Sequence, residues 1–274
     1  MDRNSPLYTI LFTVAVCAVC SVVVAGAYEL LGAKQRADAA VFRMLDILRL
    51  TGLAAADEVL ERNDILLRFQ AINPRAVDTK TWGFDSAVDA QLFDQREAAR
   101  DPLTSREAPP NDAGVRRIPD HMVVYERLDE NGRFEQILLP IQGQGYGGPM
   151  HGFLSLGPDL NTVTDIIIYE HSETPTLGGK VDRPEWRAAW VGRRVFDESG
   201  KVVLQLVADP GPPETDPYRV DAVTRASVTT GGLQAMINFW MGPDGFGPFL
   251  SQYRETLSAE TPTARMSRED AGHG

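Results

Sequence analysis

The sequence predicts an α+β fold, with a largely antiparallel sheet and helices that lie apart from the strands along the chain. Three segments between residues 121 and 208 alternate apolar and polar side chains, and turn residues divide each segment near its middle. Apolar residues at helical spacing occur before, between and after these segments. A long apolar run near the N-terminus predicts a single transmembrane helix ahead of this domain.

The composition excludes a nucleic-acid-binding function. The 274 residues include 27 Lys and Arg against 38 Asp and Glu, which gives a net charge of −11. We find no basic cluster able to neutralise phosphates. Both cysteines, Cys17 and Cys20, lie in the N-terminal apolar run. We interpret them as small membrane residues rather than a redox pair, and the rest of the chain has no disulfide.

The N-terminal run "LYTILFTVAVCAVCSVVVAGA" (7–27) carries no charge and follows a stub of residues 1–6. As a helix this run is roughly 32 Å long, which is enough to cross a bilayer. Its side chains are then expected to contact membrane lipid. A cleaved signal peptide is the alternative, but "AYELLGAKQ" offers no convincing cleavage site. Arg3 precedes the run and Lys34, Arg36, Arg43 and Arg49 follow it, so the positive-inside rule places the domain in the cytoplasm.

Residues 28–115 are expected to be a helical and connecting region. Helical spacing of Val41, Leu45 and Leu48 predicts a helix over 29–50 with a stop at Gly52. A second helix is expected over 57–72, because the following Asn73-Pro74 ends it. Residues 105–120 are expected to form a surface loop or a boundary.

The main domain is expected over residues 116–252. Its strands form three hairpins: 121–141 with Asn131-Gly132 at the turn, 151–171 with a turn around 158–161, and 193–208 with a turn at Ser199-Gly200.

Two helices are expected within the same domain. One covers 182–193 and places Trp186 and Trp190 on one face, and the other covers 231–241. Residues 253–274 are polar and are expected to be a disordered tail.

Common catalytic and metal-binding motifs are missing from the sequence. It contains no Walker A, GxGxxG, HExxH or G-x-S-x-G pattern, and "GQGYGG" (143–148) lacks the lysine of a phosphate-binding loop. The four histidines show no ligand spacing, so no metal site and no catalytic acid–base pair are expected.

Three other segments share a pattern: "GQGYGGPMHGF" (143–153), "YEHSETPTLGG" (169–179) and "VDAVTRASVTT" (220–230). Together they resemble the FMN-binding domain family of membrane redox pumps, whose marks are a Gly-rich turn, an ETPGLG loop and a DxxSGATxT attachment motif. Within it the chain is most similar to the NqrC family of the Na+-translocating NADH:quinone oxidoreductase. "NPRAVD" (73–78), "EWRAAWVGRRVFDE" (185–198) and "FWMGPDGFGPFL" (239–250) carry this closer resemblance. The RnfG family of the Rnf complex shares the flavin motifs, but "GFGPFL" is not expected there.

The resemblance implies FMN bound covalently, through its phosphate, to a hydroxyl that a flavin transferase modifies. Ser227 matches the modified position, and the other matching residues are Asp221, Thr224, Ala226 and Thr229. Arg225 replaces the family's Gly. It either strains or blocks the site, or its guanidinium pairs with the FMN phosphate. Attachment at Thr229 or Thr230, or an unmodified degenerate site, are the alternatives.

The same resemblance implies which residues surround the flavin. Glu173, Thr174, Leu177 and Gly178 match the ETPGLG loop, with Leu177 expected against the ring and Glu173-Thr174 making polar contacts. Tyr146 is a candidate to stack on the ring, with core packing the equal alternative. The tryptophans at 186, 190 and 240 are expected in the core.

The implied function is that of an electron-relay subunit of a Na+-pumping NADH:quinone oxidoreductase in the bacterial inner membrane. The other subunits are its partners and hold the NADH, quinone and Na+ sites, so this chain has no complete active site. The family places the domain in the periplasm, against the charge count, and we follow the family because large domains translocate despite flanking charge. A flavin-free assembly component and a standalone extracytoplasmic flavoprotein are the other hypotheses.

Overall fold

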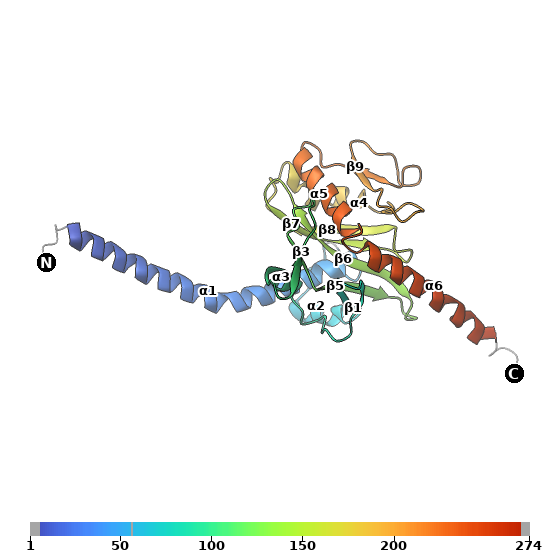
Figure 1. Cartoon of the computed structure of the whole chain (residues 1–274), viewed down its shortest axis with the longest axis horizontal. Helices are drawn as coiled ribbons and strands as arrows, with labels where there is room; N and C mark the ends of the chain where they lie inside the picture. Colours follow the sequence, from blue (N-terminus) through green and yellow to red (C-terminus); the bar gives the residue numbers. More distant parts are fainter. Residues whose placement is uncertain (1–5, 56, 270–274) are drawn as a thin grey trace.

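A computed structural model describes residues 6–55 and 57–269. The first element is one continuous helix, α1 (Pro6–Leu50), which projects far from the rest of the molecule (Figure 1). The helices expected separately over 7–27 and 29–50 are therefore a single helix, which ends two residues before Gly52. Within 6–55 and 57–269, no helix has both the length and the apolar content required to cross a membrane. The transmembrane helix expected at 7–27 stays a prediction.

A six-stranded sheet forms the centre of the molecule, in the order β2-β1-β5-β6-β7-β8. Every neighbouring pair is antiparallel, which confirms the α+β class and the antiparallel sheet. The strands are β1 (Ile72–Asp78), β2 (Gly83–Phe84), β5 (His121–Leu128), β6 (Phe134–Gln144), β7 (Pro149–Leu156) and β8 (Val163–Glu170).

Both faces of the sheet are buried, each against a different set of helices. On β6, Ile137 and Ile141 belong to the main core, which also includes residues of helix α5 (Ser227–Trp240). Leu138, between them, belongs to a second core with Ile47 and Leu48 at the end of α1. Helix α2 (Arg62–Phe69) joins this second core, so α1 and α5 lie on opposite faces of the sheet (Figure 1).

The region before residue 116 contains more strand than expected. The second helix is only α2, and Ile72, Asn73 and Pro74 begin β1 instead of ending a helix. Pro74 is tolerated because β2 pairs only with Val77 and Asp78, so the outer side of β1 has no strand neighbour at Pro74. The sheet thus begins earlier in the chain than the expected boundary at 116.

The expected loop over 105–120 also differs from the prediction. It contains strands β3 (Ser105–Glu107) and β4 (Arg117–Pro119), which pair antiparallel. They follow helix α3 (Gln95–Arg100), whose N-cap Asp94 accepts hydrogen bonds from the N–H groups of Arg96 and Glu97.

The first two predicted hairpins form, but the third does not. The turn at Ser199-Gly200 is present, because the Asp197 side chain accepts hydrogen bonds from the N–H groups of Ser199 and Lys201. Only an isolated bridge, Phe196 to Val202, flanks it. The chain then forms β9 (Gln205–Val207), which pairs in parallel with β10 (Arg219–Asp221).

The helices after the sheet also depart from the predicted bounds. The segment expected as one helix over 182–193 is a 3-10 helix, η1 (Gly178–Asp182), followed by the short helix α4 (Pro184–Ala188). The tail expected to be disordered from 253 is helical as far as the end of α6 (Gly247–Glu269). Tyr253 anchors this helix, because its ring packs edge-on against Phe84 at 5.1 Å. Residues 270–274 lie outside the described residues.

Candidate functional site

The three sequence motifs meet at the buried carboxylate of Glu173. This residue follows β8, and its Oε1 accepts a hydrogen bond from the N–H of Gly147 in the β6–β7 turn, at 2.9 Å. Its Oε2 accepts a hydrogen bond from the Oγ1 of Thr229 in the first turn of α5, at 2.5 Å. Glu173 and Thr229 are 6% and 1% exposed. We call Gly147, Glu173 and Thr229 the Glu173 junction.

Glycine is required beside this carboxylate. A Cβ on Gly178 would lie 2.0 Å from Glu173 Oε2, and a Cβ on Gly145 would lie 2.3 Å from Oε1. A side chain at either position would displace the carboxylate from its two hydrogen bonds, so the glycines of two motifs leave the space that it occupies. In this structure the polar contacts of the Glu173 side chain are with other protein groups, namely the N–H of Gly147 and the hydroxyl of Thr229.

The predicted attachment motif forms a tight turn between β10 and α5. The N–H of Ala226 donates to the carbonyl of Val223 at 3.0 Å, which closes the turn. Lys180 Nζ donates to the carbonyl of Thr224 at 3.1 Å. Trp186 Nε1 donates to the carbonyl of Asp221 at 3.1 Å, so both sides of the turn are fixed to the 178–188 region.

The hydroxyls in the first turn of α5 have different environments. Thr229 is buried in the Glu173 junction, and Thr230 Oγ1 accepts a hydrogen bond from the N–H of Val223 at 3.1 Å. Ser227 is exposed, and its hydroxyl has no hydrogen-bond partner among the described residues. Of these three side chains, Ser227 is the one accessible to an enzyme that acts on it.

The N-terminus of α5 has no side-chain cap, because its N-cap residue is Ala226. The first hydrogen bond back to the cap comes from the N–H of Thr230, at 2.9 Å. Among the residues that the structure describes, the N–H groups of Ser227, Val228 and Thr229 have no acceptor. Unpaired N–H groups at the positive end of a helix suit an anion such as phosphate, so the chain fits the phosphate of FMN at this end.

Arg225 has a left-handed backbone, with φ of 66°. This conformation favours glycine, so an arginine in it is strained. The Arg225 side chain is exposed and makes no ion pair or hydrogen bond with any residue in the described ranges. Its guanidinium is therefore available to an added anion.

Three apolar side chains are exposed around the Glu173 junction. Tyr146 is 72% exposed, Val228 57% and Leu177 40%, and each directly neighbours a residue of the junction or Gly178. Core packing, the alternative for Tyr146, is wrong. Trp186, Trp190 and Trp240 are buried as predicted. Thr174 is exposed, and its carbonyl accepts hydrogen bonds from the N–H groups of Leu177 and Gly179 at 2.9 Å each.

The structure also gathers a polar group that the sequence analysis missed. One ligand atom each of Asp78, Asp85 and His121 lies within 4.8 Å of the others, and His121 Nε2 lies 2.9 Å from Asp85 Oδ2. His121 is 36 residues beyond Asp85 in the chain and joins the two aspartates only because β1 pairs with both β2 and β5, so sequence spacing does not reveal the group.

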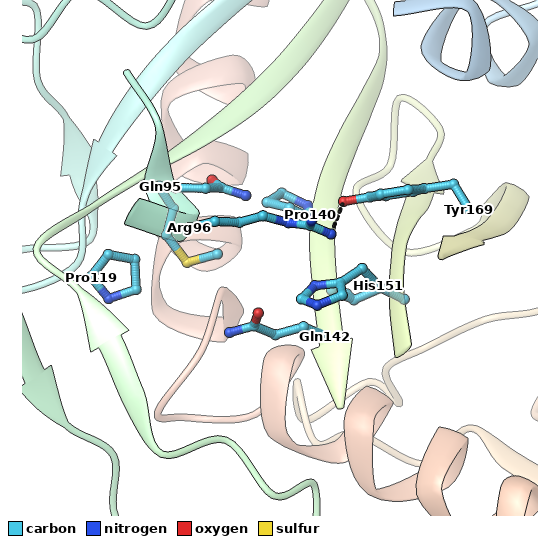
Figure 2. Close-up of a pocket in the computed structure, with 9 residues that line it drawn as sticks. Gln95, Arg96, Pro119, Pro140, Gln142, His151 and Tyr169 are labelled. Atoms are coloured by element: carbon cyan, nitrogen blue, oxygen red, sulfur yellow. Dashed lines mark hydrogen bonds between the residues drawn. The ribbon is translucent and has the colours of Figure 1, made fainter. Parts of the chain in front are cut away.

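A separate pocket lies between α3 and the sheet. Arg96 crosses this pocket and donates hydrogen bonds to Tyr169 Oη and Glu170 Oε2, and His151 and Gln142 lie beside it (Figure 2). Burial, followed by the nearby Arg96, lowers the pKa of His151 to about 4. None of the predicted flavin-binding residues lines this pocket.

Residues 145–242, which include most of the three motifs, match the FMN-binding domain family. The chain is 37% identical over 250 residues to the NqrC component of the Na(+)-translocating NADH-quinone reductase of Yersinia pestis, and the match covers 90% of this chain and 92% of the relative. The chain belongs to the NqrC family of Na+-translocating NADH-quinone reductases.

Solved structures agree with this membership. The crystal structure of Shewanella oneidensis NqrC matches with a TM-score of 0.69 and 31% identity, over 79% of this chain and 98% of that one. The NqrC counterpart from Parabacteroides distasonis matches with a TM-score of 0.59 at 19% identity, over 80% of this chain and 96% of that one, and so supports the fold alone.

Proposed function

We propose that this NqrC protein carries FMN on Ser227 through a phosphoester bond and relays electrons within a Na+-pumping NADH:quinone oxidoreductase. A flavin transferase brings FAD to Ser227. The Ser227 Oγ attacks the flavin-side phosphorus, the pyrophosphate bond breaks, AMP leaves, and the hydroxyl proton is released. When bound, FMN supplies the capacity to accept electrons from one redox centre and pass them to the next. The NADH, quinone and Na+ sites then belong to other subunits.

The hydroxyl of Ser227 carries this proposal, because it is exposed at the uncapped end of α5 and bonds to none of the residues that the structure describes. Thr229 and Thr230 fit less well, because their hydroxyls are already bonded within the protein. A phosphate on Ser227 gains the unpaired N–H groups of the first turn, and the exposed guanidinium of Arg225 lies two residues away in sequence. Attachment also retains the flavin where a shallow site would lose it by dilution.

The side chains exposed around the Glu173 junction suit a flavin ring. Tyr146 and Leu177 offer apolar surface, and Thr174 offers an exposed hydroxyl. In this arrangement the protein supplies the tether, the orientation and the electrostatic surroundings, while no acid–base residue is needed.

We further propose that the N-terminal part of α1 anchors the chain in the bacterial inner membrane and leaves the domain in the periplasm. The uncharged sequence of residues 7–27 and the exposure of apolar residues such as Phe12, Val19 and Val23 support this anchor. The family resemblance alone supports the periplasmic side.

The test is the intact mass of the full chain after co-expression with its flavin transferase, compared with Ser227→Ala. Addition of one FMN less one water to the wild type, absent from S227A, is the expected result. An unmodified wild type, with a transferase that modifies a standard substrate, would refute attachment. That outcome would favour the second candidate, a flavin-free structural component of the complex, for which the strained Arg225 is the supporting observation.

A further inference from the structure

We propose that Glu173 is the positioning residue of the attachment turn and that its buried charge also sets the reduction potential of the attached flavin. This role rests on the proposed attachment of FMN to Ser227. Glu173 does not touch the attachment hydroxyl itself. It acts through Thr229, two residues further along the first turn of α5.

The Glu173 carboxylate has a fixed direction. The N–H of Glu173 donates to His171 Nδ1 at 3.1 Å, and His171 Nε2 in turn lies 2.9 Å from Asp182 Oδ1. His171 therefore carries its proton on Nε2, because Nδ1 is the acceptor. With its main chain held in this way, Glu173 presents both carboxylate oxygens between the β6–β7 turn and α5.

A carboxylate is suited to this place because both of its partners are donors. The N–H of Gly147 and the hydroxyl of Thr229 each need an acceptor, and a carboxylate offers two acceptor oxygens and no donor. The junction thus links the Gly-rich turn, the 173–178 loop and the first turn of α5 at one point. With no cap on Ala226, this link fixes the start of α5, and through it the position of Ser227.

The same carboxylate places a negative charge beside the first turn of α5, the helix that would carry the flavin. A fixed anion disfavours the arrival of an electron nearby, and burial strengthens the effect because water screens it less. We expect Glu173 to lower the reduction potential of FMN relative to a neutral residue of the same shape. A purely structural role for Glu173 would leave this potential unchanged when its shape is kept.

The test uses the full chain co-expressed with the transferase. Glu173→Gln keeps the shape and removes the charge, while Glu173→Ala removes both hydrogen bonds. Thr229→Val removes the hydroxyl, and Thr229→Ser keeps it. Thr256→Val is the matched control, because it removes an exposed hydroxyl that bonds the Gln252 carbonyl within α6 and not the attachment turn. Three quantities are measured: the rate of FMN addition by intact mass, the reduction potential of loaded protein, and the unfolding temperature of unloaded protein.

We expect FMN addition to slow by about tenfold or more in E173A and T229V, and to stay close to wild type in T229S and T256V. E173Q should still load and should show a higher reduction potential than wild type. Where E173A fails to fold, E173Q and T229V decide the outcome. A wild-type loading rate in T229V together with an unchanged reduction potential in E173Q would refute the proposed role of Glu173. It would leave the attachment of FMN to Ser227 standing. Failure of the wild type to load would instead refute the attachment on which that role rests.

Discussion

Arg225 is the residue at which the chain departs most from its family's attachment motif. Its φ of 66° costs a non-glycine residue about 1–2 kcal/mol, and no hydrogen bond or ion pair with a described residue offsets this cost. Strain of this kind persists at functional sites where the side chain contributes elsewhere. An interaction of the guanidinium with the flavin phosphate would supply that contribution.

Replacement of Arg225 by Gly should stabilise the unloaded protein. The left-handed conformation costs glycine little, although the unfolded chain also gains freedom, so we expect the free energy of unfolding to rise by about 0.5–1 kcal/mol. Urea denaturation of the unloaded chain measures this change. Arg225→Ala keeps the unfavourable φ and should show no comparable gain. Equal gains in both variants would assign the effect to the lost charge.

His151 makes stability depend on pH. Its folded-state pKa of about 4 lies below the ordinary value of 6.5, because burial and then Arg96 disfavour the charged ring. The unfolded chain thus binds the proton first as pH falls. The contribution of His151 to the free energy of unfolding is therefore fully present above about pH 6.5 and is lost as the pH falls towards 4.

We expect this loss to be roughly 1–3 kcal/mol between pH 6.5 and 4. His151→Gln should lose less stability over the same range, because glutamine does not titrate. Urea unfolding curves at several pH values measure the difference between the two slopes. Parallel pH profiles for the two proteins would show that His151 does not contribute.

Helix α5 packs closely against the end of β6 at Gly232, whereas the adjacent Gly231 faces open space. A Cβ on Gly232 would lie 2.1 Å from the carbonyl oxygen of Gln144, whereas a Cβ on Gly231 would meet nothing within 4 Å. The backbone of the helix thus approaches the Gly-rich turn as closely as it can, and this approach brings Thr229 within reach of Glu173.

Two alanine variants test this packing. Gly231→Ala should stabilise the protein by up to about 1 kcal/mol, since alanine is the better helix former. Gly232→Ala should destabilise it by about 1–3 kcal/mol, because the helix must move away from β6. Thermal unfolding of both variants gives the comparison. A stabilised G232A would mean that α5 can shift without cost.

The elements that sequence could predict are those that local chemistry determines. Asn131-Gly132 specifies the hairpin of β5 and β6, and Gly52 marks the end of α1. Pro74 misled the prediction, because a proline that ends a helix can equally occupy a strand whose outer side is free at that point. The turn at Ser199-Gly200 was identified, but only tertiary contacts determine that β9 pairs with β10 instead.

Only those parts of the candidate site that depend on local sequence were predicted. The three motifs and the exposed Ser227 follow from the sequence and the resemblance. The junction at Glu173 does not, because Gly147 and Thr229 are 26 and 56 residues away from it along the chain. Nothing local distinguishes a carboxylate that faces a flavin from one that joins two protein donors.

At the scale of the whole molecule, the sheet separates the proposed membrane anchor from the proposed flavin attachment turn. The end of α1 packs on one face through Ile47 and Leu48, and the attachment turn lies with α5 on the other (Figure 1). The N-terminal part of α1 extends away from both cores.

Membrane anchoring by α1 is testable through its exposed valines. We expect the full chain to stay with membranes after carbonate extraction, and the double variant Val19→Asp, Val22→Asp to appear in the soluble fraction, because each charge costs about 3 kcal/mol in the bilayer centre. Val59→Asp is the matched control, since Val59 is exposed outside any helix. Equal retention of the double variant would contradict anchoring by this segment.

The continuity of α1 has a geometric consequence. Its 45 residues form one rod about 68 Å long, and its last turns are fixed in the second core. Each residue inserted into such a rod turns the domain by about 100° around the helix axis and raises it by about 1.5 Å. In the proposed anchored state, the number of residues between the anchor and Ile47 would therefore set the direction, around the helix axis, in which Ser227 faces. An insertion of two residues would turn Ser227 by about 200° around the helix axis, whereas an insertion of seven would return it to nearly the same orientation about 10 Å further along the axis.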